Sequence, residues 1–433
     1  MARRGRLVAA CAVLAFAQTM AYYVYLRDDP GNYNGAGAQG DQVAYIALAQ
    51  QVLNGTWDGA VHYMPGLPAV IALSQLIFGE PGFGIAVVQA LLYGVLVLAG
   101  SSLARRAFGD ATRAPAAAVI GLNPALGYYA AQALTEFLTG VVLFALVAVT
   151  FVWSKRPTLR GAVGAGLLIA LAGYLRSEYL GLAVLFALIV GLIGRSWRIP
   201  TVLVATVVAA MAPWVVRYAV VTGQPALYNE SPLSNLVLMG TWFRVFDEQT
   251  FAQLQQIETA PGPREQAIER ASSVGPRPEL SRRYMEQARG PYERPLGETL
   301  QLAADNIRIN LRQYLTNHLL LAPVLIWAGH TPIRQVDAPA LPSSARYAIW
   351  AAEFALLLLA VWQSALALRD RRTQALGLSF LAIVLFITGV HILIAVDERF
   401  TTPALPLIGL FAGARLGLLV RARRSRLAVG YAA

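Results

Sequence analysis

Residues 375–396 read ALGLSFLAIVLFITGVHILIAV, and the charged triplet Asp397-Glu398-Arg399 follows directly. The run contains no Asp, Glu, Lys or Arg, and it is longer than the roughly 20 apolar residues that a helix needs to cross a hydrocarbon core. A second, mainly apolar run occupies residues 400–420. Inside a bilayer only helices or closed barrels satisfy the backbone, and runs of this length indicate helices.

The composition extends this prediction to the whole chain. Of its 433 residues, 57% are hydrophobic and 14% are charged, and the mean hydropathy is +0.52. Soluble chains carry about 25% charged residues. We therefore predict an all-α polytopic membrane protein with about ten transmembrane helices, plus interfacial helices on the outer face. The predicted spans are residues 7–26, 85–103, 114–133, 137–153, 161–175, 179–193, 200–215, 348–368, 375–396 and 400–420.

Clusters of basic residues alternate with these spans. They lie at residues 3–6, 105–113, 155–160, 195–198, 369–372 and 421–426. Cytoplasmic loops are enriched in Lys and Arg, and all six clusters share one side if two shorter apolar segments, 65–78 and 319–327, do not cross. We therefore predict a multi-pass protein of the cell inner (cytoplasmic) membrane with cytoplasmic termini. The net charge of +11 reflects topology, so nucleic-acid binding is not indicated.

This topology divides the chain into three parts. Residues 1–219 form an N-terminal transmembrane catalytic module, with a first outer loop at 27–64 and a re-entrant piece at 65–79. Residues 220–345 form an outer, periplasmic segment of short helices in which no domain-sized apolar core is visible. Residues 346–433 supply C-terminal transmembrane helices and a basic cytoplasmic tail.

The chain has one cysteine, Cys11, which excludes an intramolecular disulfide and a cysteine-based metal cluster. It lies in the first apolar run, which continues to Leu26. The length of this run indicates an uncleaved signal anchor.

Ionisable residues close to membrane depth are costly and are functional candidates by default. In the predicted topology they share the outer ends of the spans: Asp41, His62, Glu136, Arg176, Glu178, Arg217 and the triplet 397–399. Simpler roles stay open. Asp41 and Glu136 stand at predicted helix starts, where a carboxylate is favourable. Arg176 and Glu178 suit an interfacial ion pair, although an arginine at an outer helix end also suits a phosphate oxygen.

Five short stretches carry a shared pattern. The first contains Asp41, Tyr45 and Gly55, then Pro65, Pro68 and Phe78-Gly79. The others are Leu134-Thr135-Glu136, residues 174–178 (YLRSE), residues 212–225 (APWVVRYAVVTGQP) and residues 398–403 (ERFTTP). In this order they resemble the GT-C glycosyltransferases, and especially the bacterial relatives of the protein O-mannosyltransferases and the lipid A aminoarabinose transferase. Two positions depart from that pattern, because Gln42 follows Asp41 where many relatives have Glu, and Glu136 stands where Asp is frequent.

The resemblance implies an inverting transfer of a sugar from a polyprenyl-phosphate-linked donor to an acceptor hydroxyl, with Asp41 as the general base. Arg217, Arg399 and Arg176 would bind the donor phosphate, the first two being favoured. Glu136 would be a second acidic residue, and it would share a divalent cation, Mg or Mn, with Asp41. Substrate contacts are implied for Tyr45, His62, Tyr63, Glu178, Tyr228, Asn229 and Glu398.

The implied partners are the polyprenyl-phosphate-sugar donor, a glycan, lipid or protein acceptor, and membrane lipids. Two other classes stay open: a secondary transporter, and a flippase for a lipid-linked or small polar substrate. A transporter is expected to place paired charges near the bilayer midplane and to show repeated halves. Here the charges lie at one face of the predicted bundle, and the sequence shows no repeat.

Overall fold

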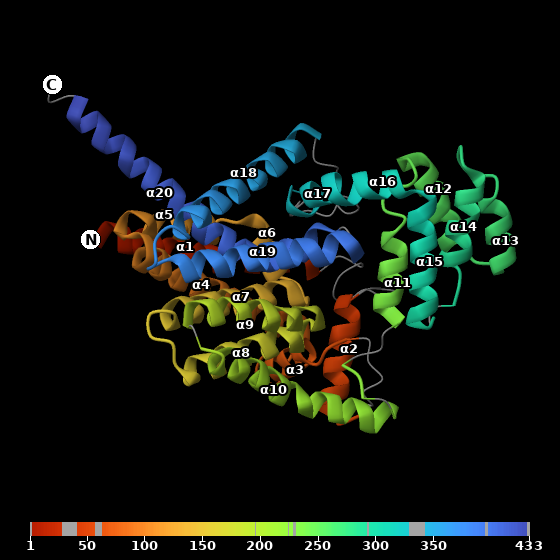
Figure 1. The fold of residues 1–433 in the computed structure, drawn as a ribbon, viewed down its shortest axis with the longest axis horizontal. Helices are drawn as coiled ribbons and strands as arrows, with labels where there is room; N and C mark the ends of the chain where they lie inside the picture. The colour runs from red at the N-terminus through yellow and green to blue at the C-terminus, as the bar shows by residue number, and fades with distance from the viewer. Residues whose placement is uncertain are drawn as a thin grey trace. The chain divides into compact units, whose positions relative to one another are not determined.

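The computed structural model describes residues 2–27, 41–56, 63–194, 196–223, 225–227, 231–291, 294–328, 343–394 and 397–430. Every regular element in these ranges is a helix, as Figure 1 shows. The chain divides into two compact units. Unit 1 comprises Met1–Tyr228, His330–Phe386 and Arg399–Ala433, and unit 2 comprises Asn229–Gly329 and Ile387–Glu398. The predicted all-α fold class is confirmed.

Within the described residues, seven helices are long and apolar enough to cross a membrane. The protein is therefore a polytopic membrane protein, as predicted. These helices are α1 (Ala2–Arg27), α4 (Pro81–Phe108), α7 (Thr135–Trp153), α10 (Arg198–Thr222), α18 (Ser343–Ala367), α19 (Gln374–Ile394) and α20 (Leu405–Gly430).

Two further predicted spans form shorter apolar helices. One is α8 (Leu159–Leu175), and the other is the 3-10 turn η2 (Ser177–Gly181) followed by α9 (Leu182–Gly194). α8 ends at Leu175, before it reaches the length of a full span, and Arg176 stands between it and η2. Arg176 and Glu178 stand at this break.

The predicted span over residues 114–133 is not continuous. It forms α5 (Arg113–Gly121) and α6 (Pro124–Ala130), separated at Asn123, whose side chain accepts a hydrogen bond from the Leu126 backbone N–H at 3.1 Å. Pro124 explains the break, because proline lacks an N–H and disfavours helical geometry at the residue before it. Pro124 has no N–H for the Ile120 carbonyl oxygen, which accepts from the Tyr93 hydroxyl at 2.7 Å. The Asn123 carbonyl oxygen accepts from the Gly127 backbone N–H at 3.3 Å and from Gln18 Nε2 at 2.8 Å.

Small residues allow helices of unit 1 to approach closely. Gly409, Gly413 and Gly417 recur every fourth residue along α20, and a Cβ on Gly413 would lie 2.5 Å from Ala116 Cα in α5. Such small-residue faces are the usual means of close helix packing in membranes. At the start of α7, a Cβ on Gly140 would lie 3.1 Å from the Pro403 carbonyl oxygen, so the chain before α20 lies against α7.

Two shorter helices stand between α1 and α4. The first is α2 (Asp41–Asn54), inside the predicted first outer loop at 27–64, and the second is α3 (Gly66–Phe78). At 1.5 Å per residue, α3 is about 20 Å long and too short to cross a hydrocarbon core. A Cβ on Gly66 would lie 2.5 Å from the Tyr174 carbonyl oxygen, so α3 starts against the end of α8. The re-entrant course of residues 65–79 stays a prediction.

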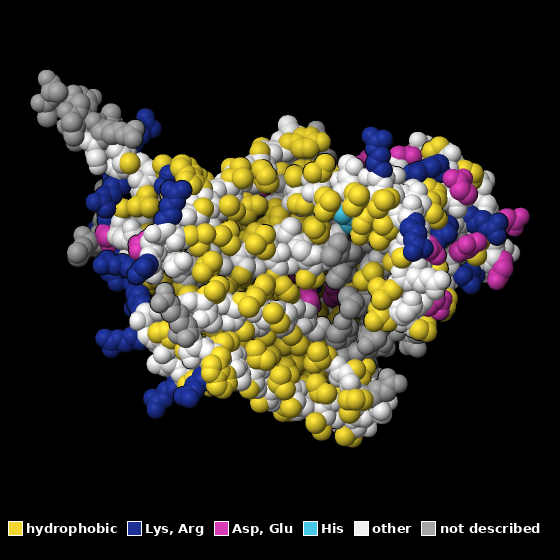
Figure 2. Space-filling model, in the orientation of Figure 1, with side chains coloured by type: hydrophobic (Ala, Val, Ile, Leu, Met, Phe, Trp, Pro, Cys, Tyr) yellow, Lys and Arg dark blue, Asp and Glu magenta, His cyan; other side chains and the backbone are white. Residues whose placement is uncertain are grey.

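The N-terminus of unit 1 lies beside the turn after α4, since Arg4 forms an ion pair with Asp110. Figure 2 shows Lys and Arg side chains gathered at this end of unit 1, where the N-terminus and the end of α20 lie in Figure 1. Hydrophobic side chains cover the adjoining surface of the unit in Figure 2. Such a band beside a basic rim is what a bilayer-embedded bundle requires.

Unit 2 contains short helices from residues 220–345 and has a cluster of buried apolar residues, although the sequence shows no domain-sized apolar core there. Its helices include α11 (Ser231–Gly240), α12 (Glu248–Thr259), α13 (Arg264–Ala271), α14 (Pro278–Ala288), α15 (Leu296–Ile309), α16 (Leu311–Thr316), the π-turn η3 (Asn317–Leu321) and α17 (Ala322–Ala328). Each core helix contributes only a few apolar residues, among them Trp242, Leu254, Tyr284 and Met285. No single segment therefore looks apolar in the sequence.

The space around two glycines predicts opposite effects of alanine substitution on the free energy of unfolding. Gly413→Ala forces a methyl group against Ala116, so we expect it to lower the free energy of unfolding by about 1–3 kcal/mol. Gly164→Ala, in α8, meets nothing within 4 Å and gains up to about 1 kcal/mol of helix propensity. Thermal unfolding of the two purified variants measures this, and equal midpoints would contradict the packing.

Candidate active site

The carboxylate of Asp41, at the first residue of α2, is held by two side chains from distant parts of the chain. Tyr63 donates its hydroxyl to Oδ1 at 3.0 Å, and Arg399 donates Nη1 to Oδ2 at 2.9 Å. Arg399 lies in η4 (Glu398–Ala404), directly before α20. The Asp41 side chain is one-third exposed, so it is both fixed and accessible. These partners go beyond a helix-capping role.

Glu136 is the second residue of α7 and is buried, with 3% of its side chain exposed. Its Oε1 lies 3.1 Å from Arg176 Nη1 and 3.9 Å from Arg399 Nε. The N-terminus of α7 adds a favourable positive potential. One buried carboxylate oxygen therefore serves two guanidinium groups.

Arg176 connects Glu136 to a third carboxylate. Its Nε lies 2.5 Å from Glu178 Oε1, and 14% of its side chain is exposed. The guanidinium carbons of Arg176 and Arg399 lie 4.9 Å and 5.1 Å from the centre of the Phe400 ring, which provides a cation–π surface for both. We call Asp41, Glu136, Arg176, Glu178 and Arg399 the carboxylate–arginine cluster. If all five ionise, three negative charges meet two positive ones.

A buried amide clamp sets the position of α2 relative to α7. Gln42, which follows Asp41, donates Nε2 to Gln132 Oε1 at 3.0 Å and accepts from the Ala133 backbone N–H at 3.3 Å. Gln89 of α4 donates to the Gln132 carbonyl oxygen at 2.7 Å. The residue beside Asp41 thus holds the segment that leads into Glu136.

Aromatic residues line the Asp41 side of the cluster. Tyr45, one turn along α2, is buried and packs edge-on against Tyr63, with ring centres 4.8 Å apart. Stacked or edge-on rings beside polar groups are usual in sugar and ligand sites, because they combine an apolar face with a hydroxyl.

The structure thus brings together seven predicted site residues: Asp41, Tyr45, Tyr63, Glu136, Arg176, Glu178 and Arg399. Arg217 is exposed near the end of α10, and the described ion pairs of the cluster do not include it. His62, Tyr228 and Asn229 lie outside the described residues, as does the side chain of Glu398. The sequence analysis did not select Phe400 or Gln42 as site residues, although each adjoins a residue that it did select.

The described residues contain no group of three or more His, Cys, Asp or Glu side chains that could hold a metal ion. Asp41 and Glu136, the predicted pair of metal ligands, are bridged instead by the Arg399 guanidinium.

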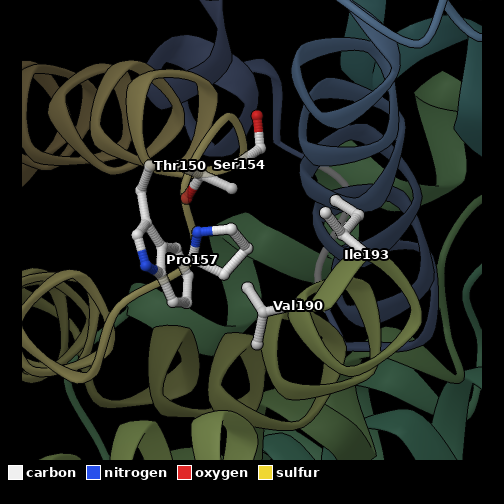
Figure 3. A pocket seen from close by; sticks show the side chains of 6 residues that line it. Thr150, Ser154, Pro157, Val190 and Ile193 are labelled. Atoms are coloured by element: carbon white, nitrogen blue, oxygen red, sulfur yellow. The ribbon is translucent and has the colours of Figure 1, made fainter. Parts of the chain in front are cut away.

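A shallow, mainly apolar pocket lies at the other end of α7, beside the end of α9 (Figure 3). Its lining has no ionisable side chain, and Thr150 is about 21 Å along the helix from Glu136 at 1.5 Å per residue. It is therefore separate from the cluster. The lining residues are Thr150, Trp153, Ser154, Pro157, Val190 and Ile193.

Comparison with protein-family models finds no match, and no curated protein matches the sequence. Solved structures do match. The oligosaccharyltransferase of Archaeoglobus fulgidus, in complex with Zn and sulfate, has a TM-score of 0.52 and 13% identity, over 97% of this chain and 50% of that one. The archaeal oligosaccharyltransferase AglB from Archaeoglobus fulgidus, in complex with an inhibitory peptide and a dolichol-phosphate, has a TM-score of 0.52 and 12% identity, over 98% of this chain and 52% of that one.

ArnT from Cupriavidus metallidurans, bound to undecaprenyl phosphate, has a TM-score of 0.37 and 17% identity, over 92% of this chain and 77% of that one. The present chain spans about half the length of the archaeal protein. The likeness to the archaeal protein shows that the chain shares the fold of that oligosaccharyltransferase, in agreement with the resemblance seen in the sequence.

The burial of Glu136 predicts a large effect for its neutral isostere. Glu136→Gln leaves Arg176 and Arg399 without their shared counter-charge, and breaking a buried ion pair in this way costs about 3–5 kcal/mol. Unfolding of the purified variant in detergent measures this loss. The control is Glu265→Gln, at an exposed position in α13, and an equally small change in both variants would contradict the arrangement.

Proposed function

We propose that the protein is a membrane glycosyltransferase of GT-C type that moves a sugar from a polyprenyl-phosphate-linked donor to an acceptor hydroxyl, with inversion. The observation that carries the proposal is the carboxylate–arginine cluster, in which one partly exposed carboxylate, Asp41, pairs with the Arg399 guanidinium, and the buried Glu136 links Arg399 to a second guanidinium, that of Arg176. A general base and an anion-binding site are the two parts that this reaction needs. The fold it shares with an archaeal protein solved with dolichol-phosphate supports the same donor class.

Asp41 is the proposed general base. A carboxylate has about four lone-pair sites, of which Tyr63 and Arg399 use one each, so an acceptor hydroxyl can still donate to it. As the acceptor oxygen attacks the anomeric carbon, Asp41 takes the hydroxyl proton. The bond between that carbon and the phosphate oxygen breaks, and a single displacement inverts the configuration.

Arg399 and Arg176 are the proposed ligands of the leaving phosphate. Both guanidinium groups share Glu136 and the Phe400 ring, which holds them in place before the donor arrives. Fixed charge placed where negative charge develops lowers the barrier without a reorganisation cost. Arg217 stays a proposed phosphate ligand as well, on the strength of its sequence motif.

The remaining contacts are proposals of the same kind. Tyr45, Tyr63 and Glu178 border the cluster and are proposed to bind the sugar or the acceptor. The same role is proposed for four residues that the sequence selected: His62, Tyr228, Asn229 and Glu398. A glycan, a lipid or a protein would serve as the acceptor.

We further propose that the cluster faces the outside of the cytoplasmic membrane. The Arg4–Asp110 pair and the basic rim of Figure 2 mark one end of unit 1, and the positive-inside rule places that end in the cytoplasm. Asp41 is the first residue of α2, Arg399 stands before α20, and α20 runs from the cluster toward its own basic end.

Neutralising the proposed base is the direct test of the function. We expect Asp41→Asn to lower the transfer of sugar from a polyprenyl-phosphate donor pool in membranes by about 100-fold or more, the typical contribution of a general base. Donor binding should persist. Asp110→Asn, at an exposed aspartate of the basic end, is the matched control. Undiminished transfer by Asp41→Asn would remove Asp41 from the mechanism, and the absence of transfer by the wild type would favour the transporter or flippase classes.

The contacts of the three arginines also predict which of their substitutions lowers activity most. We expect Arg399→Ala and Arg176→Ala each to lower kcat/KM for the donor by about 100-fold, and Arg217→Ala to have the smaller effect. Lysine in place of alanine at position 399 or 176 should restore activity only in part. It keeps the positive charge but lacks the paired, coplanar N–H donors of the guanidinium. A larger loss in Arg217→Ala than in the other two would overturn this ranking.

A further inference from the structure

We propose that the Arg399 guanidinium occupies the place of a divalent cation between Asp41 and Glu136, so that the cluster works without a bound metal ion. The inference rests on the proposed function for its catalytic meaning. The bridging position itself is a geometric observation, because Arg399 reaches Asp41 Oδ2 at 2.9 Å and Glu136 Oε1 at 3.9 Å.

The carboxylate oxygens of the two predicted metal ligands are already engaged. Asp41 Oδ1 accepts from Tyr63, and Asp41 Oδ2 accepts from Arg399. Glu136 Oε1 is shared by both arginines, whereas Glu136 Oε2 has only the long contact of 3.5 Å from Thr135 Oγ1. A hard dication requires six or more oxygen ligands, including water, around an open carboxylate face. Among the described side chains, this pair presents one weakly engaged oxygen.

The position of the Arg176 guanidinium acts against a dication between Asp41 and Glu136 as well. A metal between Asp41 and Glu136 would displace Arg399 and would still stand beside Arg176, whose side chain is 14% exposed and tied to Glu136 and Glu178. Like charges repel strongly where the dielectric is low. The cluster would therefore have to open before it admitted such an ion.

Gln42 supplies an independent observation. Its side chain is the next one along α2 after Asp41, and it is buried. It is an amide and not a carboxylate, and its Oε1 accepts from the Ala133 backbone N–H at 3.3 Å. Gln42 therefore adds no negative charge to balance a cation.

The consequence for the reaction is that a side chain supplies the charge for the leaving phosphate. A guanidinium offers planar, paired N–H donors that match phosphate oxygens. Arg399 also contacts Asp41, so the group that binds the phosphate touches the group that takes the acceptor proton.

The first test measures metal in the full-length protein, purified in detergent without chelators. We expect elemental analysis to find no stoichiometric divalent metal. Sugar transfer should change by less than about twofold with EDTA or 1,10-phenanthroline, whereas loss of a required metal or of its supporting residues costs at least about tenfold. One tightly held metal per chain, or chelator-sensitive transfer restored by one cation, would overturn the inference.

The second test removes the guanidinium. Manganese titration, followed by the electron paramagnetic resonance of free Mn²⁺ up to about 1 mM, the weak end of protein sites for hard cations, should show no site in the wild type. Arg399→Asn should gain one site, and Arg399→Asn with Asp41→Asn should lose it. Arg282→Asn, an exposed position paired with Glu286, is the control. Manganese bound by the wild type at Asp41 would contradict the inference.

These readouts separate the two proposals. If the wild type transfers no sugar from any polyprenyl-phosphate donor, the proposed function fails, but metal content and manganese binding still decide whether Arg399 replaces a cation. If Arg399→Asn does not fold, the wild-type measurements alone decide it.

Discussion

The buried carboxylate of Glu136 is the constraint on which the rest of the site depends. One of its oxygens faces guanidinium groups from two segments more than 200 residues apart in the chain, Arg176 and Arg399. Burying such charges costs more than their attraction returns in many proteins, so a buried ion pair is weak evidence for stability. The arrangement is better explained as a preorganised field, in which each charge fixes the others before a substrate binds.

Helix packing is what brings these charges within reach of one another. Gly140 lets the chain before α20 lie against the start of α7, and Gly66 lets α3 start against the end of α8. The Gln42 clamp then sets α2 against the segment before α7. Backbone contacts and neutral amides therefore position the charged groups, which leaves the ionic side chains available for substrate.

Much of the fold was predictable because a long run of apolar residues in the sequence directly indicates a long membrane helix. The cost of charge at membrane depth points to Glu136 at the start of α7 and to Arg399 just before α20, whereas Asp41 begins α2, a helix of 14 residues that is not among the candidate spans. The break at Asn123 was missed because the mean hydropathy of a span-length stretch stays high when the stretch contains a single Asn-Pro pair. The core of unit 2 was missed because each short helix contributes few apolar residues. The choice of Arg176 over Arg217 as the partner of Glu136 depends on tertiary contacts, which no local pattern contains.

The contact between Arg399 and Asp41 couples the two halves of the proposed reaction. While Asp41 is ionised, it competes with the donor phosphate for Arg399. When Asp41 takes the acceptor proton, it loses its charge, and the departing phosphate gains one as the sugar leaves. The charge of Asp41 then no longer holds Arg399. The guanidinium can therefore stabilise the departing phosphate as its negative charge develops. A side chain shared between base and leaving group thus stabilises the transition state more than the ground state, which is the requirement for catalysis.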